Sequence, residues 1–195
     1  MRTNLSFAGK NVKVISLTSC TPNEGKTSVS FQLCLSLAES GKQTILVDAD
    51  LRKSVLRGRY KANREKYGLS HYLSGQVELD DACCRTNVNN FDIIFAGPVP
   101  PNPSELLGGD AFRNMLEVLR MKYDYVIVDT PPLGSVIDAA IVGAICDGTV
   151  IVVESGAISY KFVQNVKEQL NKVGCRILGS VSYTHLRAHE TELHL

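Results

Sequence analysis

The alternation of apolar runs with helical patterns along the chain is the feature that most constrains its fold. Six runs are rich in β-branched residues and continuously apolar: VKVISLT, TILVDAD, FDIIFAG, YDYVIVDTPP, GTVIVVES and CRILGSV. Continuous apolar strands are typical of a sheet that is covered on both faces. Helical patterns separate them at about residues 26–40, 68–74, 104–122, 135–145 and 159–173. The sequence therefore predicts an α/β fold, a mostly parallel sheet with helices on both faces.

Composition narrows the class of protein further. The 195 residues suffice for one domain with a full-sized core, and no repeat or low-complexity linker divides them. The formal net charge of +1 gives no reason to expect nucleic acid as a partner. Six cysteines are scattered without a C-x-x-C pair, which favours reduced, buried thiols over disulfides. Neither an apolar signal core nor a run of roughly 18 apolar residues occurs, so we expect a cytoplasmic protein.

The segment CTPNEGKTS, residues 20–28, lies between the first predicted strand and the first predicted helix. This is the position of a phosphate-binding loop, whose usual pattern is G-x-x-x-x-G-K-[ST]. Gly25 would let the backbone approach a phosphate, Lys26 would reach the β- and γ-phosphates, and Thr27 would bind Mg²⁺. Cys20 stands at the first glycine position, so this loop must open differently. The alternative is an ordinary strand–helix turn, and the strand–loop–helix placement argues against it.

Three carboxylates follow two other strands, at the sheet edge where ligands bind in such folds. Asp48 and Asp50 end the run ILVDAD, and alternation along an extended chain would aim both side chains the same way. Two carboxylates at one strand end are costly without a cation, and a nucleotide-bound Mg²⁺ is the natural partner. Asp129 follows four apolar residues, the layout of a Walker B carboxylate. The alternatives are a solvated pair that caps a loop and a polar residue that merely ends a strand.

Together these motifs resemble the bacterial tyrosine kinases (BY-kinases), the cytoplasmic autokinases of capsule and exopolysaccharide export. The matching motifs are P-x-E-G-K-T at residues 22–27, D-x-D-x-R at residues 48–52 and D-x-x-P at residues 129–132. Residues 96–107 and 137–153 also look like connecting segments of that family, so the resemblance covers about residues 2–181. It implies a P-loop NTPase-type fold, with a kinase domain at residues 1–181, in which the first glycine of the loop is not required.

The resemblance also implies roles for individual residues. ATP would be bound by Pro22, Glu24, Gly25, Lys26, Thr27, Ser28 and Asp129. Thr27, Asp50 and Asp129 would form the Mg²⁺ shell. Asp48 would accept the proton of an incoming tyrosine hydroxyl, so that Asp48, Asp50 and Lys26 form the catalytic group. Positioning and charge neutralisation do most of the work in such a transfer.

The leading hypothesis is an ATP-dependent protein-tyrosine autokinase that regulates capsular or exopolysaccharide synthesis and export. The resemblance implies a transmembrane polysaccharide co-polymerase as activator, which would hold the protein at the inner face of the membrane, and self-association in the intact family member. The alternative is a nucleotide-gated switch ATPase of the partition or division-site type. Those proteins usually carry an early lysine, K-G-G-x-G-K, where this chain has Cys20 or Thr21. A truncated, inactive relative is a third possibility.

The two ends of the chain depart from the family pattern. The family has a helix with E-x-x-R-x-x-R before TNL, of which only Arg2 stands here, and this predicts a monomer or weak dimer rather than a closed ring. The family ends in a tyrosine cluster, whereas only Tyr183 follows Tyr160. The composition changes abruptly in residues 182–195, where we favour a sequence-joining or cloning artefact over a naturally divergent end. We expect this tail to be loosely attached.

A basic stretch follows the second predicted strand. Its cations are Arg52, Lys53, Arg57, Arg59, Lys61 and Arg64. A solvated face is the favoured interpretation, and a platform for an acidic substrate is the alternative.

Overall fold

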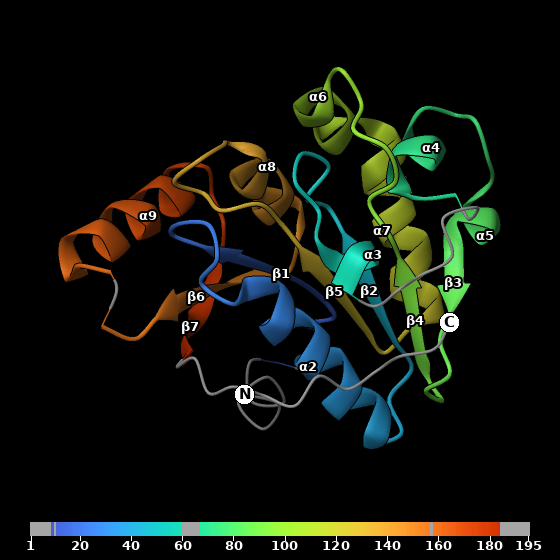
Figure 1. Cartoon of the computed structure of the whole chain (residues 1–195), viewed down its shortest axis with the longest axis horizontal. Coiled ribbons are helices and arrows are strands. Elements are labelled where there is room, and N and C mark those ends of the chain that lie inside the picture. The colour runs from blue at the N-terminus through green and yellow to red at the C-terminus, as the bar shows by residue number, and fades with distance from the viewer. Residues whose placement is uncertain (1–8, 10, 60–66, 157, 184–195) are drawn as a thin grey trace.

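One seven-stranded sheet organises the part of the chain that the computed structural model describes, which is residues 9, 11–59, 67–156 and 158–183. The strand order is β3-β4-β2-β5-β1-β6-β7 (Figure 1). Every neighbouring pair is parallel except β3 with β4, which confirms the predicted mostly parallel sheet. The strands are β1 Val14–Ser19, β2 Thr44–Asp48, β3 Cys83–Arg85, β4 Phe91–Ile94, β5 Tyr125–Asp129, β6 Gly148–Glu154 and β7 Ile177–Tyr183.

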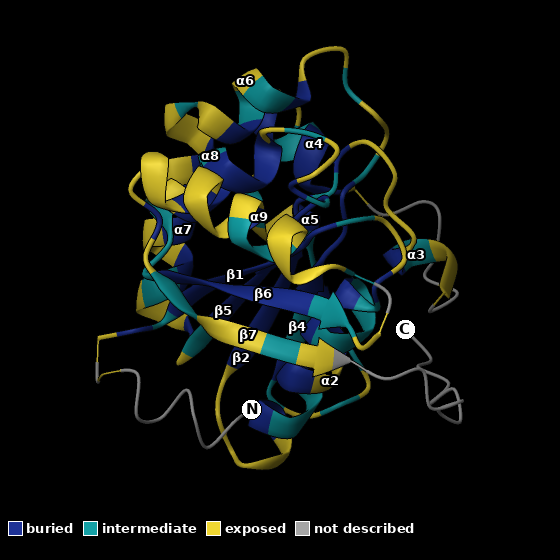
Figure 2. Cartoon of the chain, turned by 90° about the vertical axis from the view of Figure 1, so that its left-hand side faces the viewer, coloured by how far each residue is buried: buried dark blue, intermediate teal, exposed yellow. Residues whose placement is uncertain are grey.

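Helices cover both faces of this sheet, as predicted (Figure 2). They are α2 Lys26–Glu39, α3 Leu56–Arg59, α4 Leu69–Leu73, α5 Leu79–Ala82, α6 Pro103–Gly108, α7 Asp110–Lys122, α8 Asp138–Ile145 and α9 Tyr160–Lys172. Helix α2 packs on one face, and α4, α6, α7, α8 and α9 pack on the other.

Two-sided coverage explains why the strands are continuously apolar. In β1, Ile15 and Leu17 pack with Phe31 of α2, whereas Val14 packs with the helices of the opposite face. All six residues of β1 are buried, so neither side of the strand can be polar without a partner. Phe31 also contacts Phe91 of β4, with ring centroids 5.3 Å apart. The central strands are therefore held rigidly between two apolar layers.

The structure differs from the sequence prediction in its shorter elements. The helix predicted at residues 104–122 is two helices, α6 and α7, because Gly109 is extended with φ −78° and ψ 166°. Glycine has a high conformational cost inside a helix, and two glycines in succession break this one. Helices α3 and α5 have four residues each, too few to form a periodic pattern. The Cys83–Cys84 pair belongs to the antiparallel strand β3.

The remaining expectations concern cysteines and the ends of the chain. The six cysteines are free, and four of them are buried. None of the described helices has the length and the apolar composition that a membrane-spanning helix needs. Strand β7 continues to Tyr183, past the boundary predicted at residue 181. Arg2 and residues 184–195, on which the predictions about the two ends rest, lie outside the described residues.

Candidate active site

The carboxyl ends of β1, β5 and β2 are adjacent in the middle of the sheet. In the parallel register, Asp129 of β5 pairs with Leu17 of β1 on one side and with Asp48 of β2 on the other. The loop after β1 leads directly into α2. The three sequence motifs, which are separate in the chain, therefore meet at one edge of the sheet, the one formed by the carboxyl ends of the strands, as predicted.

The phosphate loop enters α2 through Gly25, which has φ 77° and ψ 8°. This left-handed conformation favours glycine because a side chain would crowd the backbone. Asn23 also has a positive φ, 68°, and asparagine is among the residues that tolerate it. The loop can therefore turn tightly although Cys20 occupies the first glycine position, and Cys20 itself is buried in the core.

Glu24 closes this loop from the inside. Its side chain is 1% exposed, and one carboxylate oxygen, Oε1, accepts hydrogen bonds from the backbone N–H and the hydroxyl of Thr21. Its other oxygen, Oε2, accepts from the backbone N–H of Glu154 at 3.2 Å, which ties the loop to the end of β6. The sequence placed Glu24 among the nucleotide ligands, but this carboxylate is occupied within the protein. The sequence pattern did not distinguish a carboxylate that binds the nucleotide from one that accepts hydrogen bonds within the loop.

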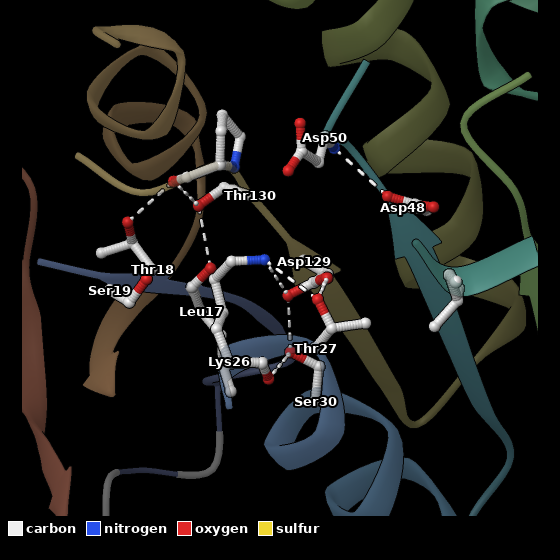
Figure 3. Close-up of polar contacts among 12 residues, drawn as sticks. Leu17, Thr18, Ser19, Lys26, Thr27, Ser30, Asp48, Asp50, Asp129 and Thr130 are labelled. Atoms are coloured by element: carbon white, nitrogen blue, oxygen red, sulfur yellow. Dashed lines mark hydrogen bonds and ion pairs between the residues drawn. The ribbon is translucent and has the colours of Figure 1, made fainter. Parts of the chain in front are cut away.

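Asp129 is the centre of the polar network (Figure 3). Its Oδ1 lies 2.8 Å from Lys26 Nζ, and its Oδ2 accepts from the Thr27 hydroxyl at 2.7 Å. The hydroxyl of Ser30 donates to Oδ1 at 2.9 Å. The structure thus joins Lys26, Thr27 and Asp129 as predicted. Ser30 was missed, although it lies one helical turn after Lys26 and hence on the same face of α2.

Asp48 is a buried carboxylate with few partners. Its side chain accepts hydrogen bonds from the Ser54 hydroxyl and, at 3.3 Å, from the backbone N–H of Asp50. Burial and the nearby charge of Asp129 raise the pKa of Asp48 to about 7. A carboxyl with this pKa can exchange a proton near neutral pH.

Asp50 does not share a face with Asp48, so that sequence prediction was wrong. Figure 3 shows the Asp50 carboxylate turned away from Asp48. It accepts from the backbone N–H groups of Arg52 and Lys53, at 3.3 and 3.0 Å. Strand β2 ends at Asp48 and the chain then turns, so the alternation of an extended strand no longer applies. The two carboxylates consequently have different hydrogen-bond donors, although the charge of Asp50 still contributes to the raised pKa of Asp48.

A second ion pair, which the sequence did not predict, supports the turn after β2. Arg52 Nε lies 2.7 Å from Oδ2 of Asp138, the first residue of α8, and Arg52 Nη2 donates to Ser104 at 2.9 Å. Ser104 in turn donates to Asp138 Oδ1 at 2.6 Å. Burial alone would raise the pKa of Asp138, but hydrogen bonds from Arg52 and Ser104 hold it below its ordinary value. The turn is thereby attached to α6 and α8.

The other predicted ligands lie outside the Asp129 network. The hydroxyl of Ser28 accepts from Arg59 Nη1 of α3 at 2.6 Å, and Pro22 is exposed in the loop. As a set, the loop and its surroundings fit a nucleotide with its metal ion. Lys26 and the N-terminal N–H groups of α2 suit phosphate, and the oxygens of Thr27 and Asp129 are the hard donors that Mg²⁺ prefers.

Comparisons with known proteins agree with this geometry. A family model described as an AAA domain matches residues 12–180. A tyrosine-protein kinase, CpsD of Streptococcus agalactiae, is 44% identical over 181 residues, which are 93% of this chain and 79% of that protein. The chain belongs to the bacterial tyrosine kinase family. The tyrosine-protein kinase etk of Escherichia coli is 38% identical and matches 93% of this kinase, which corresponds to 25% of etk.

Solved structures give the same assignment. The kinase domain of Escherichia coli ETK has a TM-score of 0.90 and 36% identity, covering 97% of this kinase and 75% of that chain. The septum site-determining protein MinD of Pyrococcus horikoshii has a TM-score of 0.75 and 24% identity over 93% of this kinase and 74% of that chain. The likeness to MinD is one of fold alone. The comparisons therefore favour a P-loop tyrosine kinase over the switch ATPase, in line with the missing early lysine at Cys20 or Thr21.

Proposed function

We propose that this kinase transfers the γ-phosphate of ATP to tyrosine hydroxyls on other copies of the same protein. It would thereby regulate capsular or exopolysaccharide synthesis and export. The observation that carries the proposal is the position of Asp48, a buried carboxylate with a pKa of about 7 on the strand next to Asp129. A switch ATPase needs a nucleotide site, whereas a kinase also needs a proton acceptor for the incoming hydroxyl. Asp48 supplies that second requirement.

The nucleotide would bind where Lys26 and Asp129 now form an ion pair. Lys26 would exchange the Asp129 carboxylate for phosphate oxygens, and backbone N–H groups at the start of α2 would bind the same anion. Thr27, Asp129 and Asp50 would hold Mg²⁺, which would neutralise charge on the phosphates. The Glu24 carboxylate would hold the loop in its bound shape through Thr21 and the backbone N–H of Glu154, without touching the ligand.

The transfer itself requires one bond to form and one to break. The tyrosine oxygen attacks the γ-phosphorus, and the bond between that phosphorus and the β–γ bridging oxygen breaks, so that ADP leaves. The hydroxyl proton passes to an oxygen of Asp48, which must therefore be ionised before the step. Lys26 stabilises the negative charge on the transferred group by position rather than by covalent chemistry.

The proposal extends to partners and location. A transmembrane polysaccharide co-polymerase would activate the kinase and hold it at the inner face of the membrane. Support comes from the family resemblance and from a solved structure, the chimerical protein CapA2B2, which is 33% identical with a TM-score of 0.88 over 95% of this kinase and 81% of that chain.

The experiment is a phosphotransfer assay with ATP labelled at the γ-phosphate and a tyrosine-rich peptide. A peptide with phenylalanine in place of tyrosine is the acceptor control, and Lys26→Met is the enzyme control. We expect label on tyrosine in the wild type and none with either control. ATP hydrolysis that depends on Lys26, without any phosphotyrosine, would favour the switch ATPase and reject the proposal.

A further inference from the structure

The basic stretch after β2 lies at the rim of the candidate active site. Ser54, within this stretch, donates its hydroxyl hydrogen bond to the buried Asp48. On one side, the backbone N–H of Lys53 donates to Asp50 Oδ1 at 3.0 Å. On the other side, α3 approaches α2, where Arg59 Nη1 lies 2.6 Å from the hydroxyl of Ser28 (Figure 1). The stretch therefore spans from the proposed proton acceptor to the first turn of the phosphate-binding helix.

The described cations of this stretch fall into two groups. Arg52 is paired with Asp138, and the guanidinium of Arg57 lies over the Phe95 ring at 5.2 Å. Both of these side chains therefore have partners within the protein. Lys53 and Arg59 are exposed, and neither forms an ion pair with any residue that the structure describes. Two positive charges are thus available to a ligand at the border of the site.

The negative charge inside the site suggests what kind of ligand these two cations attract. Asp48, Asp50 and Asp129 place three carboxylates at the edge of the sheet, and among the described cations only Lys26 is paired with one of them. Exposed cations next to such a cluster attract acidic groups to the rim that the interior would repel. Arg59 reaches the first turn of α2 with its guanidinium, and the backbone N–H of Lys53 holds that residue beside Asp50.

We propose that Lys53 and Arg59 select acceptor tyrosines that have acidic neighbours in the peptide chain. The inference rests on the proposed function, since it names the substrate class of the same site. Each cation would pair with a carboxylate beside the acceptor tyrosine, while the tyrosine hydroxyl reaches Asp48. Exposed pairs are weak individually, so we expect each cation to change kcat/KM by about three- to fivefold at low salt.

The test uses three peptides of equal length, each with one tyrosine flanked by glutamate, serine or lysine. The wild type should prefer the glutamate peptide to the lysine peptide by about tenfold or more, and 0.5 M salt should shrink this preference. The variant Lys53→Glu/Arg59→Glu should reverse the order. Lys42→Glu/Arg113→Glu makes the same charge change at two exposed residues away from the site and should keep the wild-type order. Lys53→Gln/Arg59→Gln should abolish the preference without reversing it, which guards against a folding defect of the charge-reversed variant.

The inference is overturned if the charge-reversed variant still transfers phosphate and still prefers the three peptides in the wild-type order. A selective loss of affinity for a non-hydrolysable ATP analogue, measured by calorimetry with the peptide order unchanged, would also overturn it by assigning the cations to the nucleotide. If no peptide acquires phosphotyrosine with the wild type, the proposed function fails and the inference fails with it. If the wild type phosphorylates the three peptides equally well, the inference is rejected and the proposed function stands.

Discussion

Arg52 and Asp138 form a two-point contact between the turn after β2 and the first residue of α8. Nε lies 2.7 Å from Oδ2, and Nη2 lies 3.2 Å from Oδ1. Asp138 is fully buried, so its charge depends on this guanidinium and on Ser104 for compensation. Because the N–H of Arg52 also donates to Asp50, the contact fixes the backbone that carries a proposed metal ligand.

We expect Arg52→Lys to lower the free energy of unfolding by about 1–3 kcal/mol, because an ammonium cannot reproduce the two-point contact and leaves Asp138 short of partners. Urea denaturation of the nucleotide-free protein measures this. Arg113→Lys, on the exposed side of α7, is the matched control and should change little. Equal stability of the two variants would contradict the importance of the pair.

The same pair should make stability depend on pH. The pKa of Asp138 is lower in the folded state than its ordinary value, so the folded state binds this proton less tightly than the unfolded chain. The pair therefore stabilises the protein above about pH 4 and is lost as pH falls through the lower, folded pKa. The stability difference between wild type and Asp138→Asn should thus shrink between about pH 5 and pH 2. Chemical denaturation at several pH values tests this, and a constant difference would reject it.

The pKa of Asp48 is shifted in the opposite direction to that of Asp138, so its effect on stability has the opposite sign. Its folded pKa is raised from 3.8 to about 7, so between these values the folded state holds a proton that the unfolded chain has released. Stability therefore falls as pH rises from about 4 to 7, and the full cost is present above about pH 7. We expect Asp48→Asn to stabilise the nucleotide-free protein by on the order of 2 kcal/mol at pH 8 and by nothing below pH 4, while phosphotransfer is lost. Destabilisation at pH 8 would show that the ionised carboxylate is well compensated.

The sequence predicted what depends on regular strands and failed where the chain leaves them. The sequence could bring Lys26, Thr27 and Asp129 together because a strand–loop–helix unit and a strand end have fixed geometry. The predicted orientation of Asp50 was wrong because Asp50 lies two residues past the end of β2, where the path of the chain depends on tertiary contacts. Asp138 and Ser104 were missed for a related reason. Their partner Arg52 is distant in sequence, so no local pattern could reveal the contact.

Lys26→Met should lower the affinity for Mg-ATP about 100-fold or more, because the apolar side chain cannot form the charged hydrogen bonds of the ammonium. Asp129 would keep its bonds from Thr27 and Ser30, so we expect the variant to fold with a reduced melting temperature. Calorimetric titration of the folded variant measures the affinity. Unchanged affinity would show that the nucleotide binds elsewhere.

Glu24 gives the sharpest test of how a phosphate loop forms without its first glycine. Both carboxylate oxygens accept hydrogen bonds, one from Thr21 and the other from the backbone N–H of Glu154. Glutamine has nearly the same shape, but its amide nitrogen must face one of these donors, which leaves a buried donor unpaired. We expect Glu24→Gln to weaken Mg-ATP binding about tenfold through distortion of the loop. Glu154→Gln is the control, because Glu154 contributes only its backbone N–H to this contact. If Glu24→Gln binds Mg-ATP as tightly as that control does, the loop does not depend on the buried carboxylate.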